Sequence, residues 1–116
     1  TWQTDIPSVR LLTSAIKNEI QDKNLKNNNL VVLASPDNNV YGRRYRDVLL
    51  VQDIRMKSKE EYQYSDHVFV ISIADENTIR SDPAYEMDFF RHGKLLNTRQ
   101  WPQSMWRLYL FSRNPR

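Results

Sequence analysis

Apolar residues recur every three or four positions near the start of the chain, which is the spacing of one face of a helix. The residues with this spacing are Val9, Leu12, Ile16 and Ile20. Ser8 stands directly before them, where its hydroxyl can accept a free backbone N–H of the first turn. The stretch 23–29 contains four asparagines and ends the pattern. We therefore expect an amphipathic helix that begins after Ser8 and ends near Lys23.

Two short runs of consecutive apolar residues, 30–34 and 67–73, predict strands that are buried on both faces, because neither run alternates. A second helix is expected between them, with Tyr41 and Tyr45 on its packing side. The same spacing places Arg43 and Arg46 on its water-facing side.

The last third of the chain predicts a short helix followed by a hairpin. Asp82 and Pro83 are typical of a helix start, because proline at the first helical position loses no hydrogen bond. The helix is expected over 85–90 and ends at Gly93. Residues 94–99 and 105–112 are strand candidates, joined by a connection of hairpin length.

This order of elements predicts the fold class. Helix, strand, helix, strand, short helix, strand and strand indicate an α/β fold in a single compact domain over residues 1–116. We expect a mixed sheet of about four strands, with helices that cross over between parallel strands and an antiparallel hairpin at the C-terminus.

Composition removes several function classes. The 116 residues contain no cysteine, which excludes disulfides and thiol chemistry. The net charge of +3 comes from basic and acidic residues mixed along the chain, so no nucleic-acid partner is expected. No apolar run approaches the roughly 20 residues of a membrane-spanning helix. Because the sequence begins at Thr1 rather than at methionine, we expect a domain excised from a larger protein.

The strongest candidate for a ligand site is the loop between the first strand and the second helix. Its polar residues, and the arginines that follow in the helix, are Ser35, Asp37, Asn38, Asn39, Arg43 and Arg46. Backbone N–H groups at a helix start and a guanidinium together suit a phosphate or an acidic sugar. Asp37 would repel an anion, and the loop has no glycine, so only millimolar binding is expected. A structural cap and turn is the alternative interpretation.

No catalytic, metal or cofactor site is predicted. The acidic pairs Glu60-Glu61, Asp75-Glu76 and Glu86/Asp88 point apart or into solvent, and the serines lack a GxSxG motif. His67 and His92 are the only histidines, and no HExxH motif is present. Trp101 and Trp106 predict core and rim packing, with stacking on a sugar ring as the alternative.

Several segments together resemble a known family. In order they are Trp2 with Ser8-Val9-Arg10; Leu33-Ala34-Ser35-Pro36-Asp37; Tyr41 to Tyr45-Arg46; Tyr64-Ser65-Asp66-His67-Val68-Phe69-Val70-Ile71; Tyr85-Glu86-Met87-Asp88-Phe89-Phe90; and Trp106-Arg107-Leu108-Tyr109-Leu110-Phe111. They resemble the C-terminal soluble domain of bacterial polytopic glycosyltransferases of the dolichyl-phosphate-mannose–protein mannosyltransferase-like group, also called the aminoarabinose transferase-like group.

The resemblance implies a location and a role. Such enzymes take a sugar from a polyprenyl-phosphate carrier on the extracytoplasmic face of the bacterial membrane, and their catalytic acids lie in an early loop that this sequence does not contain. The domain would contact the membrane-embedded remainder of the same protein, and its ligands would be the polyprenyl-phosphate sugar or a glycan acceptor. The alternative is a free-standing cytoplasmic α/β module that binds a ligand or regulates a partner.

Overall fold

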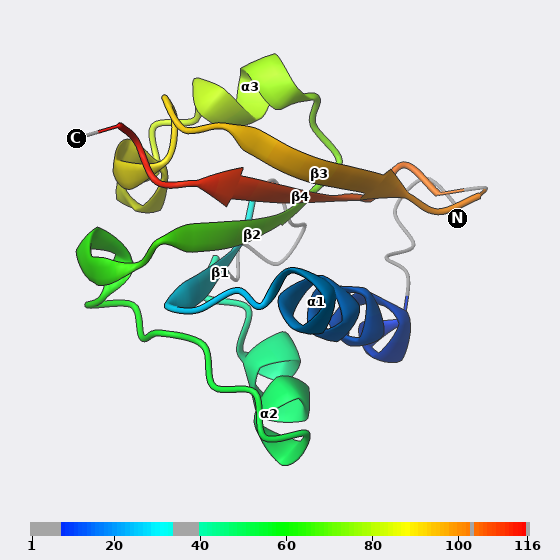
Figure 1. Ribbon diagram of the computed structural model, residues 1–116. Coiled ribbons are helices and arrows are strands. Elements are labelled where there is room, and N and C mark those ends of the chain that lie inside the picture. The colour runs from blue at the N-terminus through cyan, green and yellow to red at the C-terminus, as the bar shows by residue number, and fades with distance from the viewer. Residues whose placement is uncertain (1–7, 34–39, 103, 116) are drawn as a thin grey trace.

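Four strands lie between two layers of helices in the computed structural model, which describes residues 8–33, 40–102 and 104–115 (Figure 1). The longer elements are α1 (Val9–Lys23), β1 (Asn28–Val32), α2 (Arg43–Val51), β2 (His67–Ser72), α3 (Glu76–Arg80), β3 (Leu95–Gln100) and β4 (Arg107–Ser112). Two short 3₁₀ helices, η1 (Tyr62–Tyr64) and η2 (Tyr85–Phe89), complete the set.

The strand order is β1-β2-β4-β3, so the last strand of the chain lies between β2 and β3. β1 and β2 are parallel, with Leu30 opposite Phe69, and α2 lies in the connection between them. β4 runs antiparallel to both of its neighbours. The predicted α/β fold, with a mixed four-stranded sheet and a C-terminal antiparallel hairpin, is confirmed.

The strands β1, β2 and β4 are buried on both faces of the sheet, whereas β3 is mostly exposed. Successive side chains of a strand point to opposite sides, so each buried strand contributes to both faces. Leu30 and Phe69 pack with α1 and α2 on one face. Val31 and Val70 pack on the other face, in a cluster that includes Ile79 of α3. The continuous apolar runs of β1 and β2 are thereby explained, and the expected burial of Val32, Phe69 and Val70 is confirmed.

α1 has the predicted limits. The Oγ atom of Ser8 accepts a hydrogen bond from the backbone N–H of Leu11 at 3.2 Å. The helix ends at Asn24, whose φ of 52° is left-handed, a conformation that asparagine tolerates better than most residues. Leu12 and Ile16 are fully buried against the sheet.

Three local predictions need correction. α3 was not expected; it forms because the carboxylate of Asp75 caps it by accepting from the backbone N–H of Thr78 at 2.8 Å. The helix expected over 85–90 is the 3₁₀ helix η2. The second helix begins one residue after Gly42, so Tyr41 precedes it and is 36% exposed instead of packing on its inner side.

Candidate functional site

Of the loop predicted to bind a ligand, Ser35, Asp37, Asn38 and Asn39 lie outside the residues that the structure describes. The two arginines assigned to the same site, Arg43 and Arg46, both line an open hollow of about 460 Å³, but Arg43 is exposed in the first turn of α2 whereas Arg46 is buried. Lys59, Asp47 and Glu60 also line that hollow, so it offers an anion both attractive and repulsive charges.

Arg46 does not face water, which corrects the prediction made from the helix pattern. Only 8% of the residue is exposed. Its Nε atom donates to the carbonyl oxygen of Tyr41 at 2.6 Å, and Nη1 donates to the carbonyl oxygen of Lys57 at 2.5 Å. Nη2 reaches the carbonyl oxygen of Leu30 and Oδ1 of Asn29, both at 2.7 Å. All three guanidinium nitrogens are thus directed at protein acceptors.

Tyr62 completes this arrangement from η1. Its hydroxyl donates to the carbonyl oxygen of Leu30 at 2.6 Å and lies 3.1 Å from Nη2 of Arg46. Burial raises the pKa of the Tyr62 hydroxyl, so the group remains a neutral donor. We call Asn29, Arg46 and Tyr62 the Arg46 cluster.

The Arg46 cluster joins segments that are far apart in the sequence. Asn29 of β1 accepts from Arg46 and donates from Nδ2 to the hydroxyl of Ser65 at 3.2 Å. The same Nδ2 atom donates to the carbonyl oxygen of Ser58 at 3.0 Å. A charged group buried this way is stabilised by carbonyl and hydroxyl dipoles. The cluster therefore holds α2 and the segment 57–65 against β1.

Several of the acidic residues weighed as catalytic candidates have structural partners. Asp75 caps α3, and its hydrogen bond from the backbone N–H of Thr78 lowers the pKa of its carboxyl. Glu61 accepts from the backbone N–H of Ser58 at 3.0 Å, which likewise lowers the pKa of its carboxyl. Across residues 8–33, 40–102 and 104–115, no group of three or more acidic or histidine side chains could hold a metal ion.

Both tryptophans of the predicted aromatic hairpin belong to the core. Trp106 is 1% exposed and Trp101 is 9% exposed, and they pack in the cluster that contains Phe69. Their rings therefore offer little free surface for stacking on a sugar. The guanidinium carbon of Arg99 lies 5.0 Å from the ring centroid of Trp101, and this contact orients the arginine side chain.

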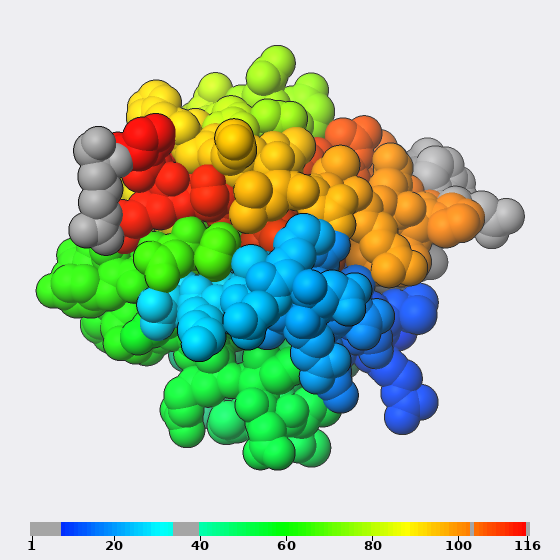
Figure 2. Space-filling model, viewed as in Figure 1, coloured from blue at the N-terminus to red at the C-terminus, as the bar shows by residue number. Residues whose placement is uncertain are grey.

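A groove that the sequence did not predict lies between α1 and the hairpin of β3 and β4. Its volume is about 240 Å³. Its lining residues are Ala15, Asn18, Glu19, Asp22, Phe69, Asn97, Arg99, Leu108 and Leu110. Figure 2 shows the surface of α1 (blue) directly against that of β3 (gold to orange). We call this feature the α1–β3 groove.

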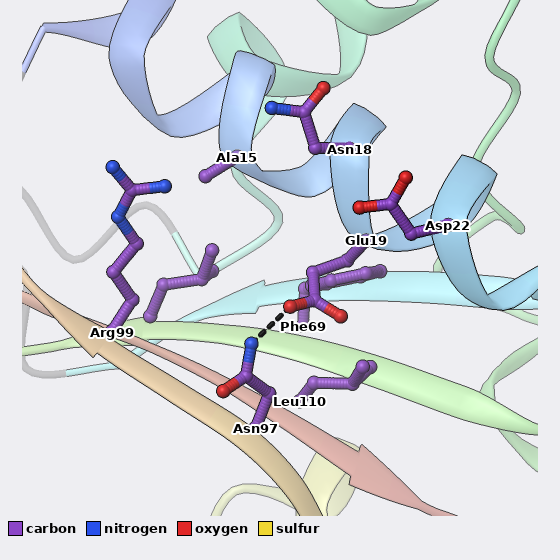
Figure 3. A pocket seen from close by; sticks show the side chains of 9 residues that line it. Ala15, Asn18, Glu19, Asp22, Phe69, Asn97, Arg99 and Leu110 are labelled. Atoms are coloured by element: carbon purple, nitrogen blue, oxygen red, sulfur yellow. Dashed lines mark hydrogen bonds between the residues drawn. The ribbon is translucent and has the colours of Figure 1, made fainter.

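Polar side chains from both walls surround the α1–β3 groove (Figure 3). Nδ2 of Asn97 donates to the carboxylate of Glu19, which joins β3 to α1. Arg99 rises from β3 on one side of this hydrogen bond, and Asp22 extends from α1 on the other. These residues are up to 80 positions apart in the sequence, and no local motif indicates that they lie close together.

Comparisons with known proteins give no relative. No family model, curated protein or solved structure matches the chain. In the part of the chain that the structure describes, no helix has the length and apolar character needed to cross a membrane.

Proposed function

We propose that this chain is an accessory domain of a membrane glycosyltransferase, placed on the extracytoplasmic face of the bacterial membrane. The whole enzyme would use a sugar linked to polyprenyl phosphate. The domain would contact donor or acceptor without catalysing transfer itself. The proposal starts from the resemblance carried by the segments quoted above.

One observation supports an accessory role most directly. Arg46 and Ser65 belong to two of the segments that carry the resemblance, and Asn29 bridges them by hydrogen bonds of 2.7 and 3.2 Å. Arg46 and Ser65 therefore help to maintain the fold. Chemistry would then be supplied by the membrane-embedded remainder.

The partners of the acidic residues agree with this division of labour. The carboxylate of Glu76 lies 2.9 Å from Nε of Arg80, and that of Asp88 lies 2.5 Å from Nη2 of Arg91. An acid used for proton transfer must reach a substrate proton. These carboxylates are instead engaged in pairs along their own segments.

Cell fractionation of the source organism with an antibody against this domain tests the proposal. The expected result is a membrane-bound band much larger than the 13.9 kDa of this chain. Protease added to intact spheroplasts should remove the epitope, because the domain faces outward. A soluble cytoplasmic band of about the chain's own size would favour the free-standing module and contradict the proposal.

An activity assay tests the division of labour separately. Purified alone, the chain should neither transfer nor hydrolyse sugars from polyprenyl-phosphate donors. Membranes that contain the full-length protein should catalyse transfer. Turnover by the isolated chain that disappears on substitution of one acidic residue would overturn the non-catalytic role.

A further inference from the structure

We propose that the α1–β3 groove binds one neutral sugar unit. This goes beyond the proposed function and does not depend on it, because a free-standing module would present the same groove. The size of the groove, its charge balance and the hydrogen-bonding capacity of its walls favour such a ligand.

The size of the groove favours a small ligand. Its volume of about 240 Å³ lies below the roughly 300–1,000 Å³ typical of sites for drug-sized molecules. Ala15 contributes only a methyl group to the α1 wall, on the side where Arg99 rises from β3 (Figure 3). A larger side chain at position 15 would project into this space.

The charges around the groove are balanced, which favours a neutral ligand. The Nζ atom of Lys23 lies 2.5 Å from Oε2 of Glu19 and compensates that carboxylate. Asp22 and Arg99 then leave one negative and one positive charge on the two walls. A phosphate would be attracted by Arg99 but repelled by the acids of α1. A simple amine would be attracted by those acids but repelled by Arg99.

The walls supply complementary hydrogen-bonding groups. Within the described residues, the side chains of Asn18, Asp22 and Arg99 have no hydrogen-bonded protein partner. A carboxylate only accepts, a guanidinium only donates, and an amide does both. Sugar hydroxyls donate and accept, so one ring can satisfy both kinds of group.

The floor of the groove is the closed surface of the hydrophobic core. Phe69, Leu108 and Leu110 line it, but they are only 0%, 4% and 1% exposed. A ligand would therefore be held chiefly by the polar side chains of the two walls.

Amide NMR titration of the 116-residue chain tests this inference. The neutral probes are methyl glucoside, methyl mannoside and N-acetylglucosamine; the charged probes are glucosamine and glucose 1-phosphate. At least one neutral probe should give saturable shifts at the amides of Asn18, Asp22 and Arg99, with a Kd in the millimolar range. The charged probes should bind less tightly.

Matched variants identify the groove as the site. Asp22→Ala and Arg99→Gln should each raise Kd by about tenfold. Asp47→Ala and Arg10→Gln change exposed residues of the same types elsewhere and should leave Kd unchanged. Ala15→Leu should abolish the shifts by filling the groove. The amides of Val70 and Tyr109 on the opposite face report whether that variant keeps its fold.

Several outcomes would overturn the inference. One is the absence of saturable shifts with every neutral probe at about 50 mM, a concentration well above a millimolar Kd. Tighter binding of a charged probe, or shifts confined to residues 35–43 or 101–106, would also contradict it. So would an equal loss of binding in the control variants. If Ala15→Leu fails to fold, the variants of Asp22 and Arg99, which are exposed, decide the question.

Discussion

The Nη2 atom of Arg46 lies 2.7 Å from the backbone carbonyl oxygen of Leu30, in the interior between α2 and β1. This oxygen faces away from β2, on the side of the strand where the sheet ends. A side chain thus occupies the position that a neighbouring strand would fill. The edge of β1 is closed to pairing with another chain at this point.

Substitution of Arg46 should be among the most damaging changes to the domain. Arg46→Ala leaves several buried acceptors without their donor, and each such group costs about 1–3 kcal/mol, so we expect a loss of roughly 3 kcal/mol or more. Arg46→Lys should also destabilise the fold, since one ammonium cannot reproduce the guanidinium geometry. Urea unfolding measures both. The exposed neighbour Arg44, changed to alanine, should alter stability by less than about 0.5 kcal/mol.

Tyr62 should make stability depend on pH in the alkaline range. Burial raises the pKa of its hydroxyl in the folded state above the usual value of about 10. Above pH 10 or so the unfolded chain releases this proton and the folded chain retains it, so stability falls as pH rises. Tyr62→Phe removes this contribution. The free energy of unfolding that the variant loses relative to the original chain should therefore be smaller at pH 11 than at pH 8. Tyr64→Phe, at an exposed position, should show no such trend.

Phe69 is fully buried in β2, and Phe69→Ala should cost about 3–5 kcal/mol through the cavity it creates. Domains of this kind have a total stability of about 5–15 kcal/mol, so the variant should melt at a much lower temperature. Ile73→Ala, immediately after the same strand at a 37% exposed position, should cost under about 1 kcal/mol. A neutral Phe69→Ala would contradict the placement of β2 at the centre of the core.

Gly93 should tolerate alanine less well than Gly42. A Cβ atom at position 93 would lie 1.7 Å from the carbonyl oxygen of Ser112, so the backbone at the end of β4 must move, at about 3 kcal/mol or more. At Gly42 the new atom would meet only side chains, at 3.0 Å and beyond. The φ of 69° there adds about 1–2 kcal/mol of left-handed strain. The denaturation midpoint of Gly93→Ala should therefore be lower than that of Gly42→Ala. The reverse ranking would contradict this prediction.

Local patterns in the sequence were sufficient for most of the fold. The spacing of apolar residues and the cap at Ser8 define α1, because helix formation depends on neighbours within one or two turns. The unbroken apolar runs define β1 and β2 as strands buried on both faces. The order of the elements predicted the parallel pair and the C-terminal hairpin.

The tertiary structure alone decided where the polar residues act. Helical periodicity assigns a charged residue such as Arg46 to solvent, and only the carbonyls of Leu30 and Lys57, brought close by folding, give it a buried position. The α1–β3 groove likewise depends on contact between Glu19 and Asn97, which are 78 residues apart. A sequence pattern records the polarity of near neighbours. It does not record which distant acceptors and donors will meet, because that is fixed by the packing of whole elements.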